Sequence, residues 1–405
     1  MHQRLRHIVF SCITSLLIGV TFIVSCASLM GLIESPTQSY LEGRLYQKPP
    51  VLTADSLSSK TFQDETNQYF ADKVPFRNNV LLANASLQRF QIGFANTLFR
   101  YPAYPTFFDS FYIYAPAYGV VVESPSVTKN ESKEVLGKSV EAFGGFIDDN
   151  PQVNWVFALV DRSRISLASP AHSLVVSPAD YPYYSENFLR KLPQTCSIVE
   201  LSYDDPQSYF KDFFKSDHHW QISGALKAYD AICKELGRTP VRHDNLTIGF
   251  PGPFYGSESR NGLFTGVFDF VEDVEFTPGN YNVIVDGEEK SLEFLCYAYG
   301  KTDTPYTLKN EYESAYGHYF HGDYGLIEIH NADAPAGSLL IIGDSFTDNV
   351  DRFFAENYKD VYIIDPRHYK GGFKAFFEGH DVDDAVFLMA SNTVITSSVQ
   401  EALKS

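Results

Sequence analysis

Cysteine is scarce in this 405-residue chain, which has five, and none of them forms a Cys-x-x-Cys pair. This spacing argues against a structural zinc site and against a thioredoxin-type redox site. Cys12 and Cys26 lie in an apolar N-terminal stretch, whereas Cys196, Cys233 and Cys296 lie in the body of the chain. Three cysteines cannot all pair within one chain. The alternatives are a Cys196–Cys233 bridge and isolated buried thiols, of which we favour the thiols.

Basic residues are also few, since 32 Lys and Arg stand against 50 Asp and Glu, for a formal net charge of −18. The sequence has no basic stripe, no zinc-finger spacing and no long run of charge. Because such a chain repels phosphate backbones and anionic headgroups, we expect no nucleic-acid partner. Repeats and low-complexity tracts are absent too. Hydrophobic residues make up 44% and aromatics 15% of the chain, so the body should fold around a substantial core.

The N-terminus carries a long apolar run. Residues 8–33 contain no charged side chain, follow Arg4 and Arg6, and exceed the roughly 20 residues that cross a bilayer. We therefore expect a signal anchor over residues 1–34, a transmembrane helix that leaves the N-terminus in the cytoplasm and the body outside, at the cell surface. A lipobox-like sequence that ends at Cys26 makes a lipidated N-terminus the alternative, although the residues after it are apolar.

The rest of the chain divides by composition. Residues 35–60 are polar and contain prolines, which predicts a stalk, and residues 61–405 predict one extracytoplasmic domain. Apolar residues at helical spacing predict a helix after Pro75. Residues from about 238 to 335 are rich in turn residues and predict a β-rich insertion.

Short apolar runs mark the expected strands of this domain. They lie at 153–161, 172–177, 196–202, 338–344, 360–365 and 384–390. The last three runs are apolar on both faces, which is typical of buried parallel strands. Helical patterns separate them, so we expect an α/β layered domain with a parallel central sheet.

A run of titratable residues precedes a predicted helix in the middle of the chain. The helical pattern begins at Ile222 and ends before Gly237, so the Asp-His-His-Trp run at 217–220 should enter the helix from an extended connection. Residues two apart in an extended segment share a side, which would place Asp217 beside His219 and turn the intervening histidine away. A carboxylate in that position fixes the imidazole tautomer and stabilises the imidazolium. Helix capping, or metal binding by the two histidines, is the alternative.

A second constellation, Gly343-Asp344-Ser345-Phe346, stands between a buried strand and a helical pattern over 347–358. A serine at a strand-to-helix turn lies at the carboxyl end of a parallel sheet, where α/β sites form. Helix N–H groups beside it can stabilise an oxyanion. Gly343 allows the turn. Helix capping by Asp344 or Ser345 is the alternative that requires no catalysis, and Asp344 is the expected turn residue.

Together these segments resemble the DHHW protein family of bacteria. The resemblance covers most of residues 61–375 and rests on SDHHWQISGALKAY, LLIIGDSFTDNVDRFFAENYKDVYIID, FADKVPFRNNV, FYGSESR, YFHGDYGLIEIHN and YIIDPRHYKGG. That family is similar to the SGNH-hydrolase-like domains of the alginate O-acetyltransferases AlgJ and AlgX. The resemblance implies a three-layer SGNH-hydrolase-like fold with Asp217, His219 and Ser345 as a catalytic triad. The serine comes last in the chain, and because geometry rather than chain order defines a triad, this order is no obstacle.

The resemblance also implies a function, namely acyl transfer, with O-acetylation of a cell-surface polysaccharide ranked first. His219 would take the proton of Ser345, Asp217 would orient the imidazole, and the Ser345 and Phe346 amides would hold the oxyanion. Further candidates for substrate or oxyanion contacts are Tyr255, Arg260 and Trp220. No metal or cofactor is implied. The expected partners are a polysaccharide or cell-wall glycan acceptor and a membrane protein that delivers the acyl donor. A carbohydrate esterase, or a non-catalytic glycan-binding or assembly protein, is the alternative.

Overall fold

The structure of the chain is a computed structural model. It describes residues 2–30, 32, 37–99, 104–105, 112–115, 118–123, 129–160, 187–201, 203, 206–250, 252–296 and 311–405. The strand predicted at 172–177 lies outside the described residues. The chain divides into two compact units, Met1–Gln91 and Ile92–Ser405, and each is described by itself below.

The first unit is mostly helical. Its elements are α1 (His2–Leu29), β1 (Gln38–Ser39), β2 (Arg44–Leu45), α2 (Ala54–Ser58), α3 (Thr61–Asp72) and the first part of α4 (Arg77–Phe99). Within the predicted stalk, β1 and β2 form a hairpin that Asp72 ties to α3. The Asp72 carboxylate accepts hydrogen bonds from Arg44 Nη1 at 3.0 Å and from the Gln47 amide at 2.8 Å.

Two helix predictions fall in this region. The helix expected after Pro75 is present as α4, and apolar residues of its predicted face, among them Phe90 and Phe94, are exposed. Within the described part of the chain, no helix is both long and apolar enough to cross a membrane. The transmembrane helix expected over residues 1–34 is therefore unsupported.

The second unit is a mixed α/β fold. Its helices are α5 (Lys129–Asp149), η1 (Leu189–Lys191), α8 (Pro206–Asp212), α9 (Ile222–Glu235), α10 (Ser257–Asn261), α11 (Glu293–Cys296), α12 (Ala315–Tyr319), α13 (Asp351–Phe354), α14 (Phe373–Gly379), α15 (Ser391–Val394) and α16 (Ser397–Ala402). Its strands are β3 (Tyr104–Pro105), β4 (Tyr112–Ala115), β5 (Val120–Glu123), β6 (Asn154–Val160), β7 (Cys196–Glu200), β8 (Leu246–Ile248), β9 (Glu272–Val274), β10 (Tyr281–Val285), β11 (Glu288–Lys290), β12 (Leu326–Asn331), β13 (Ser338–Gly343), β14 (Asp360–Ile364) and β15 (Asp384–Ala390).

An eight-stranded sheet organises this unit, in the order β11-β10-β12-β14-β13-β15-β6-β7. The five strands from β14 to β7 run parallel, which confirms the parallel sheet expected from the doubly apolar runs. The other three strands come from the predicted β-rich insertion and pair antiparallel with their neighbours. Much of that insertion therefore extends the central sheet, while β8 and β9 form a separate pair.

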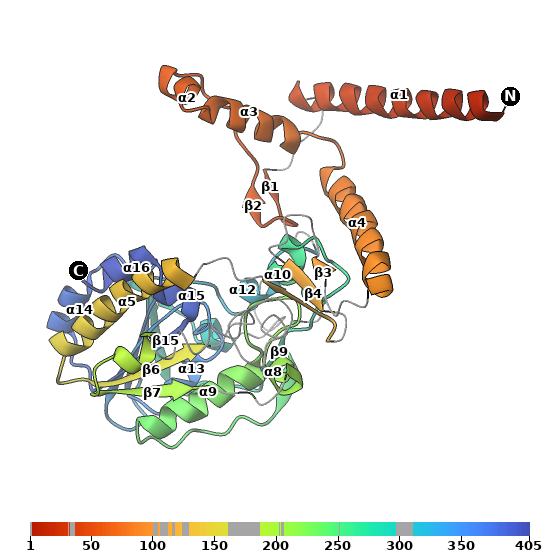
Figure 1. The fold of residues 1–405 in the computed structure, drawn as a ribbon. Helices are drawn as coiled ribbons and strands as arrows, with labels where there is room; N and C mark the ends of the chain where they lie inside the picture. Colours follow the sequence, from red (N-terminus) through yellow and green to blue (C-terminus); the bar gives the residue numbers. More distant parts are fainter. Residues whose placement is uncertain are drawn as a thin grey trace. The chain divides into compact units, whose positions relative to one another are not determined.

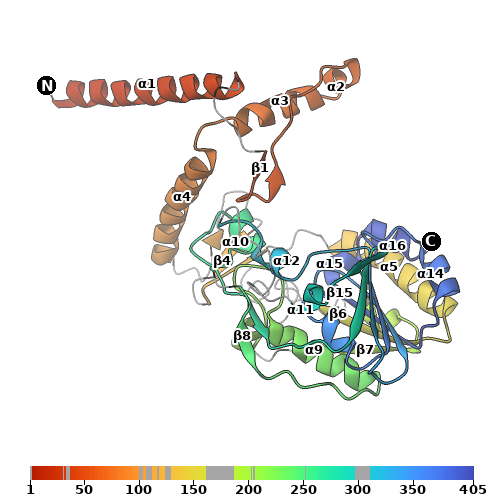
Figure 2. The ribbon, with the colours of Figure 1, turned by 180° about the vertical axis from the view of Figure 1, so that it is seen from behind.

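Helices cover both faces of the sheet, as Figures 1 and 2 show, with α5, α14 and α16 on one face and α9 on the other. Successive residues of β13 alternate between these layers. Leu339 and Ile341 pack in the core that contains the apolar face of α9, and Leu340 and Ile342 pack in the core beneath α5. The helix predicted from Ile222 is present, and Gly237 has the φ of +67° expected of a left-handed cap.

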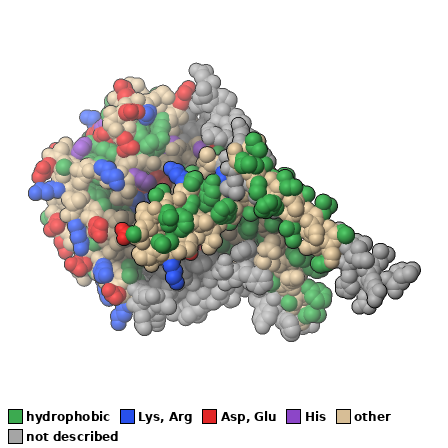
Figure 3. Space-filling view, turned by 90° about the horizontal axis from the view of Figure 1, so that it is seen from above, with side chains coloured by type: hydrophobic (Ala, Val, Ile, Leu, Met, Phe, Trp, Pro, Cys, Tyr) green, Lys and Arg blue, Asp and Glu red, His purple; other side chains and the backbone are tan. Residues whose placement is uncertain are grey.

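The surface and the cysteines bear on two expectations from composition. Among the side chains described on the face drawn in Figure 3, Lys and Arg are scattered among Asp and Glu without a broad basic patch.

Cys196 and Cys233 are separate buried thiols, which confirms the favoured alternative, and burial raises the pKa of each to about 12. Neither thiol is therefore ionised near neutral pH.

A buried ion pair connects α13 to the β8–β9 pair. Arg352 is fully buried, and its guanidinium donates to the carboxylate of Asp273 and, at 3.2 Å, to the carbonyl of Leu295. The Tyr319 hydroxyl donates to the other Asp273 oxygen at 2.9 Å. Removing one member of such a pair leaves a charge without compensation in a medium of low polarity.

We expect Asp273→Ala to lower the free energy of unfolding by about 3–5 kcal/mol, because the buried Arg352 guanidinium would lose the carboxylate to which its Nη2 donates. Urea denaturation of the full chain measures this. Asp230→Ala is the control, since Asp230 pairs with Arg242 at the surface, where the two side chains are 36% and 70% exposed. That change should cost less than about 1 kcal/mol. Equal losses for both variants would contradict the role assigned to the buried pair.

Candidate active site

Ser345 stands just beyond the end of β13, at the carboxyl edge of the parallel strands. Gly343, the last residue of β13, passes so close to its neighbours that an added Cβ would lie 2.5 Å from the Leu388 carbonyl oxygen and 2.2 Å from Thr347 Cγ2. Its φ is not among the positive values of the chain. The glycine is therefore needed for this close approach rather than for an unusual turn conformation.

Asp344 builds the turn that carries the serine. Its Oδ1 accepts the Phe346 amide at 3.1 Å, and its carbonyl accepts the Thr347 amide at 2.8 Å. Its Oδ2 accepts the Ala390 amide at 3.0 Å and the Thr393 hydroxyl, which ties the turn to the end of β15. These bonds agree with the interpretation of Asp344 as a turn residue.

The segment after Ser345 differs from the expected helix. The expected helix over 347–358 is replaced by turns, followed by α13, which has four residues and begins only at Asp351. We expected the Phe346 amide to face an oxyanion. Instead, it donates a hydrogen bond to Asp344 Oδ1. The carboxylate captures that amide because a short acidic side chain competes well for nearby N–H groups at a strand end.

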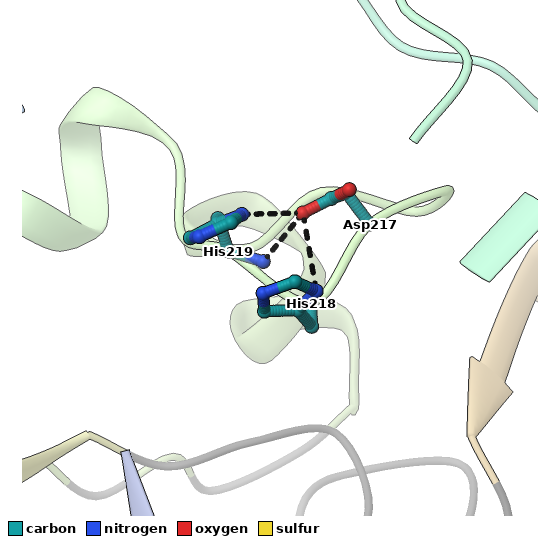
Figure 4. A group of neighbouring side chains, drawn as sticks. All are labelled: Asp217, His218 and His219. Carbon is teal, nitrogen blue, oxygen red and sulfur yellow. Dashed lines mark hydrogen bonds and ion pairs between the residues drawn. The ribbon is translucent and has the colours of Figure 1, made fainter. Parts of the chain in front are cut away.

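The Asp-His-His-Trp run is a bent hairpin rather than an extended connection. An antiparallel bridge joins Phe213 to Trp220, and the Phe214 amide donates to the His219 carbonyl at 3.1 Å. The prediction that His218 points away from Asp217 and His219 is wrong. Its Nδ1 lies 3.6 Å from Asp217 Oδ1, and the ring centroids of His218 and His219 lie 3.9 Å apart (Figure 4).

Asp217, His219 and Ser345 form a continuous relay. Asp217 Oδ1 lies 2.6 Å from His219 Nδ1, and His219 Nε2 lies 2.7 Å from Ser345 Oγ. The two ends of the second contact are 126 residues apart in the sequence. Asp217 and His219 are buried and Ser345 is half-buried, so the serine is the most exposed residue of the three. This is the arrangement in which an imidazole accepts a proton from a hydroxyl while a carboxylate orients it.

The charge of Asp217 is fixed by its surroundings. Burial alone would raise the pKa of this carboxyl. The charges of His218 and His219, together with hydrogen bonds to both carboxylate oxygens, outweigh burial and hold the pKa of Asp217 well below its ordinary value. The carboxylate is therefore ionised near neutral pH and can stabilise positive charge on the His219 ring.

Helix α10 supports the carboxylate from the other side. The Ser257 amide donates to Asp217 Oδ2 at 2.6 Å, and the Ser257 hydroxyl lies 2.9 Å from His218 Nδ1. Gly256 makes this approach possible, since a Cβ there would lie 2.3 Å from the Ser216 carbonyl oxygen and 2.4 Å from the Asp217 Cβ. These residues belong to the FYGSESR stretch, which the sequence marks only through the family resemblance.

Tyr316, which the sequence did not single out, holds both the base and the serine. Its ring stacks on His219 at 4.1 Å between centroids and 12° between planes, and its hydroxyl donates to the Ser345 carbonyl at 3.0 Å. Burial, with nearby carboxylates, raises the pKa of Tyr316 well above 10, so the hydroxyl remains a donor. Nothing in its local sequence, ESAYGHYF, distinguishes this tyrosine from its neighbours.

The remaining predicted site residues occupy two environments. Trp220 and Phe346 are buried and pack edge to face at 5.4 Å, and the Trp220 indole donates to Asn349 Oδ1 at 2.7 Å. Both therefore belong to the packing behind His219. Arg260 is buried, which lowers its pKa, and it donates to the Tyr312 carbonyl at 3.0 Å. Tyr255 is half-buried beside Tyr312. The substrate roles expected of these residues stay predictions.

Two groups of side chains in the described residues have spacing that a metal ion could use, Asp217-His218-His219 and Asp323-Asp365-His368. In the first group, both ring nitrogens of His219 already face partners in the relay. A metal there would have to displace one of them. In the second group, Arg367 lies 3.2 Å from Asp323 and also pairs with Asp365, so its charge already compensates the carboxylates. Proton relay is thus the chemistry that the first arrangement favours.

Gly256→Ala should lower turnover of a small ester by about 10²-fold, because the added methyl displaces α10 from Asp217. It should also cost about 1–3 kcal/mol of unfolding free energy through overpacking. Gly145→Ala is the control, since Gly145 lies in α5 with no atom within 4 Å of the added Cβ. That change should stabilise by up to about 1 kcal/mol. Wild-type turnover in Gly256→Ala would contradict this account.

Tyr316→Phe keeps the ring stacked on His219 and removes the hydrogen bond to the Ser345 carbonyl. A lost hydrogen bond of about 1 kcal/mol should lower kcat roughly fivefold. Tyr319→Phe removes a hydroxyl from the same helix, α12, where it is bonded to Asp273. It should reduce stability without lowering the kcat of the folded protein. Steady-state kinetics and thermal unfolding of both variants separate the two effects, and equal losses of kcat would contradict the role of Tyr316.

Comparison with known proteins agrees with this fold. A family model described as "DHHW protein" matches residues 159–364, about half of the chain. No curated protein matches the chain. Among solved structures, a DHHW family protein from Eubacterium siraeum is 15% identical with a TM-score of 0.55, and the match covers 73% of this chain and 95% of that one.

Two further structures are similar to this chain. PatB1 of Bacillus cereus is 20% identical with a TM-score of 0.51, over 69% of this chain and 96% of its own. The O-acetyltransferase domain of Pseudomonas putida AlgJ is 11% identical with a TM-score of 0.38, over 73% of this chain and 96% of its own. The family match spans both the Asp-His-His-Trp run and the serine turn, and the chain is a member of the DHHW protein family.

Proposed function

We propose that this chain is an acyl-transfer enzyme that O-acetylates a cell-surface polysaccharide, with Ser345 as nucleophile, His219 as general base and Asp217 as the residue that orients it. One observation carries the proposal, namely the relay of 2.6 Å and 2.7 Å contacts from a buried carboxylate through an imidazole to the hydroxyl of a half-buried serine. A helix cap needs neither the second contact nor the buried carboxylate behind the ring.

The proposed reaction has two halves. Ser345 Oγ attacks the acyl carbonyl while His219 Nε2 takes the hydroxyl proton, and the imidazolium then gives that proton to the leaving group. The product is an acyl ester on the serine. In the second half, a sugar hydroxyl gives its proton to His219 and attacks the ester. The serine oxygen leaves and recovers that proton, so the enzyme returns to its starting state.

The parts that surround the relay suit this chemistry. Asp217 stays ionised and so stabilises the imidazolium that each half reaction forms. The ring of Tyr316 covers one face of His219 and limits its rotation, while the Tyr316 hydroxyl positions the Ser345 backbone. The Ser345 amide remains the predicted oxyanion donor, whereas the Phe346 amide is occupied by Asp344.

The finer parts of the proposal rest on the sequence. The SGNH-hydrolase-like assignment, the location outside the cytoplasm and the membrane partner that supplies the acyl donor follow from the family resemblance and from the N-terminal sequence. Water in place of the sugar hydroxyl would make the same relay a carbohydrate esterase. The two activities differ in whether product formation requires a glycan acceptor.

A direct test is covalent capture of the nucleophile. PatB1 has been solved with a sulfonyl adduct, and a sulfonyl fluoride reacts with activated serine hydroxyls as a class. The full chain should be labelled at Ser345 by phenylmethylsulfonyl fluoride, and the modified peptide should be identified by mass spectrometry. Labelling should vanish in His219→Asn. Labelling elsewhere, or none, would remove Ser345 from the role of nucleophile.

His219→Asn should lower turnover of p-nitrophenyl acetate, with or without a glycan acceptor, by at least about 10³-fold, because the serine loses its base. His330→Asn is a matched control. His330 Nδ1 lies 2.7 Å from Asp360, in the same imidazole–carboxylate pairing, and its Nε2 lies 3.9 Å from Glu328 rather than beside a serine. Turnover should survive that change. Similar losses in both variants would indicate a structural effect and count against catalysis by His219.

A further inference from the structure

A run of four aromatic rings lies on the β-rich segment beside the relay. Phe268 and Phe270 have ring centroids 5.8 Å apart, Tyr255 lies 5.8 Å from Phe268, and Tyr312 lies 5.5 Å from Tyr255. We name these four residues the aromatic run. Phe268 and Phe270 are 45% and 54% exposed, and the two tyrosines are half-buried. Large rings held together at a surface usually serve an interaction.

Strand geometry explains why these rings face outward. Burial alternates along residues 267–271 as it does along a strand, so that Val267, Asp269 and Val271 are buried while the two phenylalanines are exposed. Asp269 bridges antiparallel to Phe254, which places the next residue along, Tyr255, beside Phe268.

The aromatic run is attached to the relay through both segments of the Phe254–Asp269 bridge. The inward Asp269 accepts the Ser216 amide at 2.8 Å and the Ser216 hydroxyl at 2.6 Å, directly before Asp217 in the chain. In the other segment, Tyr255 precedes Gly256 and Ser257, and the Ser257 amide donates to Asp217. A ligand held on the rings is therefore held beside the segments that fix the Asp217 carboxylate.

Charge limits what this surface can bind. The chain carries a formal net charge of −18, and exposed Glu272 and Glu311 lie two residues after Phe270 and directly before Tyr312. A polyanion would be repelled there. Aromatic rings present a negative π face, which attracts the weakly positive C–H groups of a sugar ring without requiring charge.

We infer that the aromatic run is the acceptor subsite and that it binds an uncharged glycan chain by stacking sugar rings on Phe268, Phe270 and Tyr255. The role of acceptor rests on the proposed function. Binding of the glycan to the rings, by contrast, requires no turnover.

Binding is therefore tested in the full chain carrying Ser345→Ala, where failure of catalysis cannot affect the result. Isothermal titration calorimetry with chitohexaose and cellohexaose, both uncharged, is compared with a polygalacturonate hexamer, which is anionic. We expect the uncharged hexamers to bind and the anionic one not to bind. The double variant Phe268→Ala/Phe270→Ala should raise Kd roughly tenfold or more, because two stacking rings are lost.

The matched control is Phe90→Ala/Phe94→Ala, which removes two rings of α4 that are 73% and 63% exposed and should leave Kd unchanged. Equal Kd values in both double variants, tighter binding of the anionic hexamer, or no binding of any hexamer would overturn the inference. So would a concentration-dependent self-association lost only in Phe268→Ala/Phe270→Ala, since the rings would then contact a second copy of the chain. Absence of transferase activity in the wild-type chain, with glycan binding intact, would count against the proposed function alone.

Discussion

The carboxylate of Asp217 connects three segments that are far apart in the sequence. One oxygen lies against His219 and the other accepts the Ser257 amide, while His219 in turn reaches Ser345. A buried carboxylate is costly unless its lone pairs are satisfied, so each of these contacts must be made for the others to persist. The position of the imidazole, the approach of α10 and the charge of the site all depend on this one group.

The central sheet supplies the other fixed point. β13 is bordered on both sides by parallel strands and is buried on both faces, so the serine turn begins from a rigid support. Asp344 then ties that turn to the end of β15. Rigid elements hold a reacting group more accurately than a free loop can, because packing removes alternative rotamers and backbone positions.

Much of the sheet and the identity of the relay residues could be predicted from the sequence. Doubly apolar runs mark β13, β14 and β15 because strands buried on both faces need no polar alternation. The bend that brings His218 towards Asp217 could not be predicted, since it depends on Gly256 and on Asp269 from a distant segment. Tyr316 was missed for the same reason, because its role arises from tertiary stacking and leaves no local pattern. The prediction of a helix over 347–358 was wrong because turns built on Asp344 and Thr347 follow Ser345, and the helix begins only at Asp351.

The strand order has a consequence for how such a chain is made. The middle of the sheet, β14, β13 and β15, comes from the last part of the sequence, whereas the flanking strands β10, β12, β6 and β7 come earlier. A chain synthesised from its N-terminus therefore carries two separated sheet edges until its final residues emerge. The pairing that joins the two parts has to wait for residues 338–390, and a product terminated before Ser345 would hold the base without the nucleophile. Such non-local assembly is slow, and it leaves unpaired edges open to the holdase chaperones that bind unfolded chains.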